Sequence, residues 1–223
     1  MESEKKFVWQ IFDDKSNTFH QRSFDHVYGS SNYWGMDFIY KEIYEWEFSP
    51  ENCVYELWDC VLKDEDVVVD LGANVGFFTR KASAKASKVV AIEGSPEAFS
   101  CLVRNTSDLP HVFCLNVCVT GQGKGDPYLW SIKGNPLQMK LESVFELYGL
   151  EKIDFFKCDI EGGEYALFKS LDPTLLNKID RIAVETHSEE ENVSFHLPGK
   201  IRHEFFWDYG GGSQTMFYFI TPK

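Results

Sequence analysis

A short apolar run that ends in a glycine-rich loop constrains the fold of this chain most strongly. The run is Val67-Val68-Val69-Asp70, and the loop continues as Leu71-Gly72-Ala73-Asn74-Val75-Gly76. A uniformly apolar run of β-branched residues is typical of a parallel strand buried on both faces. Glycines let the backbone turn sharply and approach a ligand where a Cβ would collide. The segment therefore predicts a strand, a ligand-binding turn and a helix, in that order.

Strand-like and helix-like segments alternate after this loop as far as residue 187. Such alternation predicts an α/β fold in which helices cover both faces of a parallel sheet. Residues 121–136 are rich in glycine and proline and are expected to leave the predicted parallel sheet. The predicted strands are 67–70, 88–92, 112–119, 153–160 and 181–185, and the predicted helices are 75–86, 96–105, 141–148 and 163–171.

Two aromatic segments near the end, residues 204–209 and 214–220, flank the turn Gly210-Gly211-Gly212-Ser213. This pattern predicts a β-hairpin, so the last strand should run antiparallel to its neighbours. A dinucleotide-binding sheet is normally parallel throughout, and the hairpin argues against that class.

The first 62 residues do not share the alternation and are rich in aromatic side chains. We expect residues 1–62 to form a cap, including a helix within 38–48, and residues 63–223 to form the ligand-binding domain. Most of these aromatic residues are interpreted as packing on the sheet. The alternative is a substrate lid that contributes Tyr33 or Trp34, because Ser30-Ser31-Asn32 resembles a mobile turn.

Charge and cysteine content narrow the function further. The chain has 35 acidic and 22 basic residues and a formal net charge of −13. Such a surface repels phosphate backbones, which argues against a nucleic-acid substrate. The six cysteines form no C-x-x-C pair and are expected to be buried free thiols. With no stretch long enough to span a membrane and no signal-type segment, we expect a soluble, cytoplasmic protein; its oligomeric state is not predicted.

The spacing of the glycine loop indicates the kind of cofactor. It reads Asp-x-Gly-x-Asn-x-Gly, whereas Gly-x-Gly-x-x-Gly accommodates a pyrophosphate. S-adenosylmethionine has no phosphate and carries an α-ammonium, which a carboxylate such as Asp70 complements. Glu93 ends the next strand, where an acid can accept both ribose hydroxyls. The predicted cofactor-binding residues are Asp70, Gly72, Asn74, Gly76, Phe77, Glu93, Gly94, Ser95, and, bordering the adenine, Asn116 and Cys118.

The alternative is that Asp70 caps a helix and Glu93 is a solvated strand end. Two acids at the carboxyl ends of successive strands favour the cofactor interpretation.

Four segments together resemble the FkbM-type methyltransferases. They are residues 67–76, 91–99, 141–143 and 153–164, and the last contains the string Lys-x-Asp-x-Glu-Gly-x-Glu. The resemblance covers roughly residues 60–188, with Gly94 where the family more often has proline. It implies a class I methyltransferase fold, which is a Rossmann-like, doubly wound, mostly parallel seven-stranded sheet with a C-terminal antiparallel hairpin. It also implies S-adenosylmethionine as methyl donor and a hydroxyl acceptor, often on a sugar or glycan.

Methylation of a hydroxyl requires help, because an alcohol is a poor nucleophile at neutral pH. Asp159 closes the fourth strand with Lys157 on the same face, and Glu185 and His187 share a face of the fifth. These strands are neighbours in the fold, so the predicted catalytic residues Asp159, His187, Glu185 and Lys157 should converge. In one interpretation His187 or Asp159 is a general base. In the other, Asp159 and Glu185, with or without His187 as a third ligand, hold Mg²⁺ or Mn²⁺.

The metal-free base is preferred. Glu164, at the start of the next helix, is expected to complement the helix dipole, whereas Glu161 fits that role and catalysis equally well.

Three other functions stay open. The chain could methylate another small molecule, a lipid or a protein; it could be an NAD-dependent oxidoreductase; or it could bind cofactor without catalysis. The missing Gly-x-Gly-x-x-Gly argues against the oxidoreductase, and the complete set of acids argues against the non-catalytic module.

Overall fold

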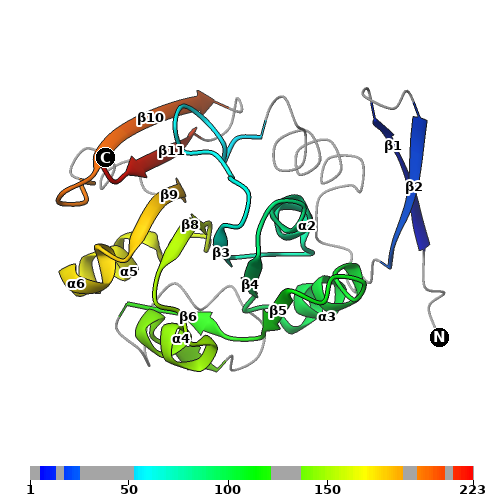
Figure 1. Ribbon diagram of the computed structural model, residues 1–223, viewed down its shortest axis with the longest axis horizontal. Coiled ribbons are helices and arrows are strands. Elements are labelled where there is room, and N and C mark those ends of the chain that lie inside the picture. Colours follow the sequence, from blue (N-terminus) through cyan, green and yellow to red (C-terminus); the bar gives the residue numbers. More distant parts are fainter. Residues whose placement is uncertain are drawn as a thin grey trace.

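A seven-stranded sheet forms the centre of the protein (Figure 1). The computed structural model describes residues 6–13, 18–25, 53–121, 137–187, 195–208 and 213–222. The strands of this sheet are β3 (Val67–Leu71), β4 (Lys88–Ile92), β5 (Val112–Leu115), β8 (Ile153–Cys158), β9 (Ile179–Thr186), β10 (Ile201–Asp208) and β11 (Ser213–Ile220).

The strand order is β5-β4-β3-β8-β9-β11-β10. The five strands from β5 to β9 are parallel, and β11 runs antiparallel to both β9 and β10. Numbered along the chain, this order is 3-2-1-4-5-7-6, whereas a dinucleotide-binding sheet reads 3-2-1-4-5-6. The predicted mostly parallel sheet with a C-terminal antiparallel hairpin is therefore confirmed.

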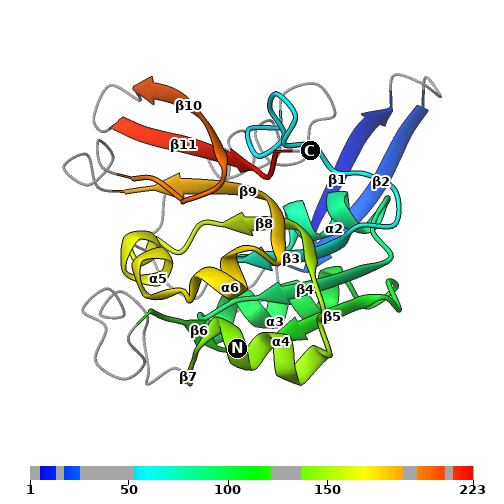
Figure 2. The same cartoon turned by 60° about the vertical axis from the view of Figure 1, so that its left-hand side comes forward.

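Helices cover both faces of the sheet (Figure 2). Successive side chains of a strand point to opposite faces, so Val68 and Val69 of β3 enter different clusters. The cluster around Val68 includes residues of α2 (Phe77–Ser83) and of the segment 53–62. On the same face, α3 (Pro96–Asn105) contributes Leu102. The opposite cluster contains residues of α4 (Leu141–Tyr148), α5 (Glu164–Ser170) and α6 (Pro173–Leu176).

One predicted strand, 112–119, is wrong as a single element. After β5 the chain leaves the main sheet, and β6 (Cys118–Val119) pairs instead with β7 (Gln138–Met139). The Asn116 side chain donates to the carbonyls of Glu93, at 2.7 Å, and Gly94, at 3.3 Å. These bonds tie the chain to the end of β4 and end the regular ladder. Helix α6 was not predicted, although Asp172 caps its N-terminus and a proline follows.

The N-terminal segment contains an antiparallel pair that the sequence pattern did not predict. It is formed by β1 (Lys6–Asp13) and β2 (Thr18–Asp25). The helix expected within 38–48 and the lid residues Tyr33 and Trp34 lie outside the described residues. Residues within 53–62 pack on the sheet, and the division into a cap of residues 1–62 and a domain of residues 63–223 stays a prediction.

The six cysteines are free thiols, five of them buried and Cys114 half-buried, as predicted. No helix within the described ranges is long and apolar enough to cross a membrane.

Gly72 makes the closest approach between the glycine loop and the end of β8. Its φ is +78°, and a Cβ built there would lie 1.6 Å from the Asp159 carbonyl oxygen. The Asp159 amide also donates to the Leu71 carbonyl at 3.0 Å. Only glycine lets these two strand ends lie this close.

This contact predicts unequal costs for two glycine substitutions. Gly149 is also left-handed, at φ +59°, but a Cβ there meets nothing within 4 Å. Gly149→Ala should cost about 1–2 kcal/mol of unfolding free energy from backbone strain alone. Gly72→Ala should cost clearly more, because the loop must also separate from Asp159. Denaturant unfolding of both variants measures the difference, and equal losses would contradict the tight contact.

Candidate active site

The carboxyl ends of β3, β4, β8 and β9 meet at one edge of the sheet, where polar side chains gather. Asp70 pairs with Lys157 across β3 and β8, and Cys158 pairs with Val184 across β8 and β9. The structure thus brings together Asp159, Glu185 and His187 from neighbouring strand ends, as the sequence predicted.

Glu93 braces the glycine loop. Its two carboxylate oxygens accept hydrogen bonds from the amides of Asn74, at 2.8 Å, and Ser95, at 2.7 Å. The amides of Gly72 and Ala73 both donate to the Ile92 carbonyl at 3.0 Å. Burial raises the pKa of Glu93, while the two amide bonds oppose the rise. Glu93 is therefore an anchored acid rather than a solvated strand end.

The remaining predicted cofactor residues lie at the start of α2 and in the segment after β5. Gly76 is the N-cap of α2, and Phe77 is the first residue of that helix and is buried. Asn116 contacts the backbone at the end of β4, as described above, and Cys118 is buried in β6. Asp70 contacts α2 through a side chain: the Thr79 hydroxyl donates to Asp70 Oδ2, and Asp70 Oδ1 has no hydrogen-bond partner among the described residues.

Lys157 is a buried cation beneath the loop. Its Nζ donates to the Gly72 carbonyl at 2.6 Å and lies 3.5 Å from Asp70 Oδ1 and 3.8 Å from Asp159 Oδ2. Asp70 is fully buried and accepts a hydrogen bond from Thr79 at 2.5 Å. Burial raises the pKa of Asp70, while Lys157 and Thr79 oppose the rise. Lys157 therefore ties β3, the loop and β8 together.

His187 lies among four carboxyl groups. Its Nδ1 is 3.2 Å from Glu164 Oε1, and its Nε2 is 3.4 Å from Glu161 Oε2. The same Nε2 is 4.0 Å from both Asp159 Oδ1 and Glu185 Oε1. Burial alone would lower the pKa of His187, but the Glu164 bond and the surrounding negative charges raise it to about 10. At neutral pH the imidazole therefore holds its proton.

Glu164 does more than complement the dipole of α5. It is fully buried, and Oε1 accepts from the amides of Ile160, at 3.0 Å, and Gly162, at 3.1 Å. The loop it braces has left-handed backbone at Glu161, φ 57°, and Gly162, φ 112°. Glu164 thus shapes this loop and orients His187. In the sequence, the feature that could have indicated this role is the position of Glu164 as the second acid of the Glu-Gly-x-Glu string.

Tyr55 is a site residue that the sequence analysis missed. Its hydroxyl lies 2.9 Å from Asp159 Oδ2 and 3.0 Å from Glu185 Oε2. The side chain is only 1% exposed, and Lys157 Nζ lies 5.0 Å from the ring centroid. Tyr55 lies outside every motif of the sheet, so no spacing pattern singled it out.

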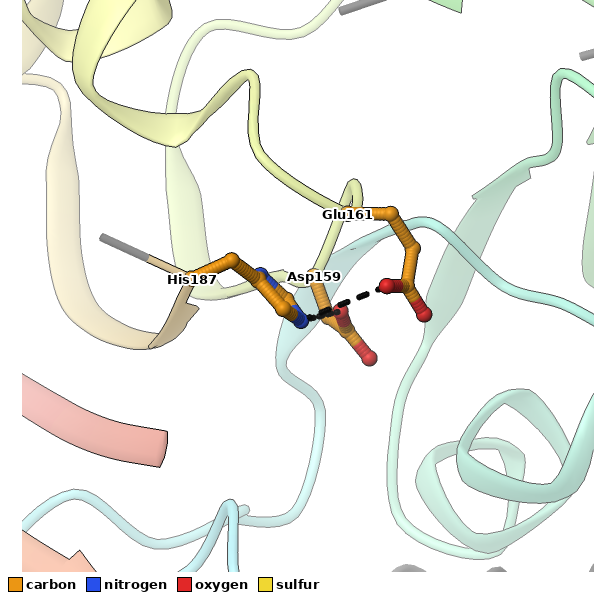
Figure 3. Close-up of side chains that lie close together, drawn as sticks. All are labelled: Asp159, Glu161 and His187. Atoms are coloured by element: carbon orange, nitrogen blue, oxygen red, sulfur yellow. Dashed lines mark ion pairs between the residues drawn. The ribbon is translucent and has the colours of Figure 1, made fainter. Parts of the chain in front are cut away.

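The group best placed to hold a cation differs from the predicted pair Asp159 and Glu185. Ligand atoms of Asp159, Glu161 and His187 all lie within 4.8 Å of one another (Figure 3). Glu185 is not in this group, and its Oε2 is within hydrogen-bond distance of the Tyr55 hydroxyl.

The strand order and the polar edge at the carboxyl ends define a class I methyltransferase fold. Residues 135–210 match the family model described as the methyltransferase FkbM domain, which confirms the resemblance seen in the motifs. The chain is also 24% identical to "Methyltransferase 1" of Beauveria bassiana (strain ARSEF 2860), over 67% of this chain and 73% of that protein.

Solved structures give weaker likenesses. A rRNA methylase from Streptococcus thermophilus is 14% identical with a TM-score of 0.47, covering 72% of this chain and 90% of its own. TrmN from Thermus thermophilus is 15% identical with a TM-score of 0.48, and the match covers 72% of this chain but only 45% of TrmN. The fold assignment rests on the strand order itself.

The charged state of His187 predicts how stability depends on pH. The pKa is raised from 6.5 to about 10, so proton binding stabilises the folded state. That contribution is complete below the ordinary pKa and is lost as the pH rises through the folded pKa. We expect the unfolding free energy of the wild type to fall more steeply toward alkaline pH than that of His187→Gln. The exposed His196 serves as control, and a His187→Gln curve parallel to that of the wild type would contradict the assignment.

Proposed function

We propose that this protein is an S-adenosylmethionine-dependent O-methyltransferase whose acceptor is a hydroxyl of a sugar or glycan. The observation that carries the proposal is the contact between the glycine loop and Asp159. Gly72 holds the loop against the Asp159 backbone, so the cofactor loop and an acid lie side by side. Transfer to a hydroxyl needs both elements in one place.

The acidic edge fits S-adenosylmethionine better than a phosphate-bearing cofactor. Glu93 is anchored at the end of β4, where an acid accepts ribose hydroxyls. Asp70, Asp159 and Glu185 add acidic groups nearby, which favour a cation and disfavour a pyrophosphate. When bound, S-adenosylmethionine supplies an electrophilic methyl on a positively charged sulfur. The loop backbone at Gly72–Gly76 and Glu93 are the residues proposed to hold it.

Asp159 is the proposed general base. Its Oδ1 is buried and has no hydrogen-bond partner among the described residues, whereas Oδ2 accepts from Tyr55. His187 holds its own proton at neutral pH and so is the weaker candidate for the base. We assign His187 instead to balancing the surrounding carboxylates, with Glu164 fixing its orientation. Lys157 positions the loop and Asp159 rather than touching the acceptor.

The charge of the protein favours an uncharged acceptor. A net charge of −13 disfavours a polyanionic acceptor such as nucleic acid, and a neutral sugar hydroxyl meets no such repulsion. Another small molecule, a lipid or a protein is the alternative. A divalent cation at Asp159, Glu161 and His187 is the alternative to the metal-free base.

Transfer of a labelled methyl group tests the proposal. The protein is incubated with S-adenosylmethionine labelled in the methyl group and a panel of sugars, glycans, phenols, lipids and RNA, and products are mapped by mass spectrometry. We expect label on a sugar hydroxyl oxygen. Asp159→Asn should lower the rate by about a hundredfold or more, since it removes the base. Glu146→Gln, an exposed acid of α4, is the matched control and should match the wild type.

Label on nitrogen, on carbon or on RNA would contradict the proposed acceptor.

The same assay after chelation separates the metal-free base from the cation mechanism. Full activity in chelator supports Asp159 acting without a metal, and loss that Mg²⁺ or Mn²⁺ restores supports the cation.

A further inference from the structure

The turn that follows Tyr55 presents an exposed indole beside the C-terminal hairpin. We propose that Trp58 and the side chains around it bind a sugar ring of an oligosaccharide acceptor, at a subsite separate from the methylated hydroxyl. In taking this ring as part of the acceptor, the inference rests on the proposed function. It adds a binding site at the outer strands β10 and β11 to the polar edge at the strand ends.

Trp58 occupies an unfavourable position for an aromatic residue. It lies in a turn closed by the Cys60 amide, which donates to the Leu57 carbonyl at 3.0 Å. Its backbone is left-handed, with φ 53°, and the residue is 49% exposed. Bulky residues rarely adopt this backbone, and strain of this kind is concentrated at ligand-binding positions. The turn therefore holds a large apolar ring in contact with solvent, where a ligand can reach it.

Two aromatic neighbours from the hairpin hold the indole in place. The His203 ring of β10 stacks on it, with centroids 5.0 Å apart and an interplanar angle of 18°. The Tyr218 ring of β11 meets it in a T-shaped contact, also at 5.0 Å. Tyr218 is fully buried, and its hydroxyl donates to the Val54 carbonyl, which ties the segment 53–62 to the hairpin. A ring fixed in this way loses little conformational freedom when a ligand binds.

A hollow of about 420 Å³ lies beside the indole and is lined by Trp58, Arg202, His203 and Glu204. Sites for small ligands have volumes of roughly 300–1,000 Å³. Arg202 Nη2 lies 2.5 Å from Glu204 Oε2, so the lining carries a pair of opposite charges. An anionic ligand would meet the exposed Glu204, and a cationic ligand would meet Arg202. The hollow therefore suits an uncharged ligand that forms hydrogen bonds.

A sugar ring has the chemistry that complements this lining. Its C–H groups form an apolar face that packs on an aromatic ring such as Trp58. Its hydroxyls accept hydrogen bonds from the Arg202 guanidinium and donate to the Glu204 carboxylate. A purely apolar ligand would cover these charged groups without replacing their hydrogen bonds to water, which is costly. A nucleotide would bring phosphate toward Glu204 and toward a chain with a net charge of −13.

The hollow and the candidate active site are connected through one face of the sheet. Tyr55, Met216 and Tyr218 belong to the same core cluster. Glu185 pairs with Met216, and Tyr218, two residues further along β11, pairs with His203. Strands lie about 4.8 Å apart and rise about 3.4 Å per residue, which puts the His203 backbone about 12 Å from that of Glu185. One sugar ring cannot span this distance, so the hollow holds a further ring of the acceptor.

An array of immobilised neutral and charged oligosaccharides tests binding without any turnover. Trp58→Asn removes the ring, and asparagine tolerates the left-handed backbone. Glu204→Ala changes an exposed side chain and leaves the turn intact. We expect the wild type to bind neutral oligosaccharides and each variant to bind them about tenfold more weakly or worse. Phe113→Ala removes an exposed ring at the opposite edge of the sheet and should bind as the wild type does.

Binding to no oligosaccharide, undiminished binding by either variant, or a preference for charged over neutral oligosaccharides would overturn the proposal. Binding that Trp58→Asn weakens, without transfer of a methyl group to any sugar, would support the subsite and count against the proposed function alone.

Kinetics with two acceptors test whether the subsite is separate from the reacting hydroxyl. The acceptors are the oligosaccharide that binds best on the array and the monosaccharide that carries its methylated hydroxyl. Trp58→Asn should raise the KM for the oligosaccharide about tenfold more than the KM for the monosaccharide, because only the longer acceptor reaches the hollow. Phe113→Ala should leave both values as in the wild type. An equal rise in KM for the two acceptors would show that Trp58 acts on the reacting ring and would overturn the proposal.

Discussion

The ammonium of Lys157 is the interaction on which the arrangement of this site depends. It is buried at the carboxyl end of β8, donates to the Gly72 carbonyl and lies near the carboxyl groups of Asp70 and Asp159. A buried charge is costly unless it is paired and hydrogen-bonded. Here one cation serves two acids from adjacent strands and a loop carbonyl. Removing it would leave the fully buried Asp70 and the half-buried Asp159 without this neighbouring positive charge.

A second cation, His187, has the corresponding role at the end of the neighbouring strand β9. Its ring lies between acids of the loop after β8 and the end of β9, and its raised pKa reports the negative charge around it. The positive charges of Lys157 and His187 offset the repulsion between the acids gathered at this edge of the sheet. The same excess of acid suits a cationic cofactor, so the electrostatics that hold the site together also support its proposed ligand.

Much of the fold follows from local pattern. The predicted bounds of β4, α3 and α4 agree with the structure, because each is set by local signals: an apolar run, an N-cap followed by proline, and a glycine after the last turn. The break after β5 could not be predicted in this way, because Asn116 ends the strand by bonding to the end of β4, more than twenty residues away in sequence. Long-range bonds of this kind leave no periodic signal.

The candidate site, like the fold, could be predicted in part from the sequence. Acids at the ends of parallel strands had to converge, and Asp159, Glu185 and His187 do. The sequence could not show that four carboxyl groups would surround His187 and keep it protonated, which shifts the proposed base to Asp159. Nor could it show Tyr55, which reaches the site from the segment 53–62, where no motif is found.

Calorimetric titration shows whether the glycine loop and Glu93 bind S-adenosylmethionine. S-adenosylmethionine and, separately, NAD are titrated into the wild type and into Glu93→Ala, which removes the acid that braces the glycine loop. We expect saturable binding of S-adenosylmethionine to the wild type, binding weakened by about tenfold or more in Glu93→Ala, and no binding of NAD. Binding of NAD without S-adenosylmethionine would contradict this expectation.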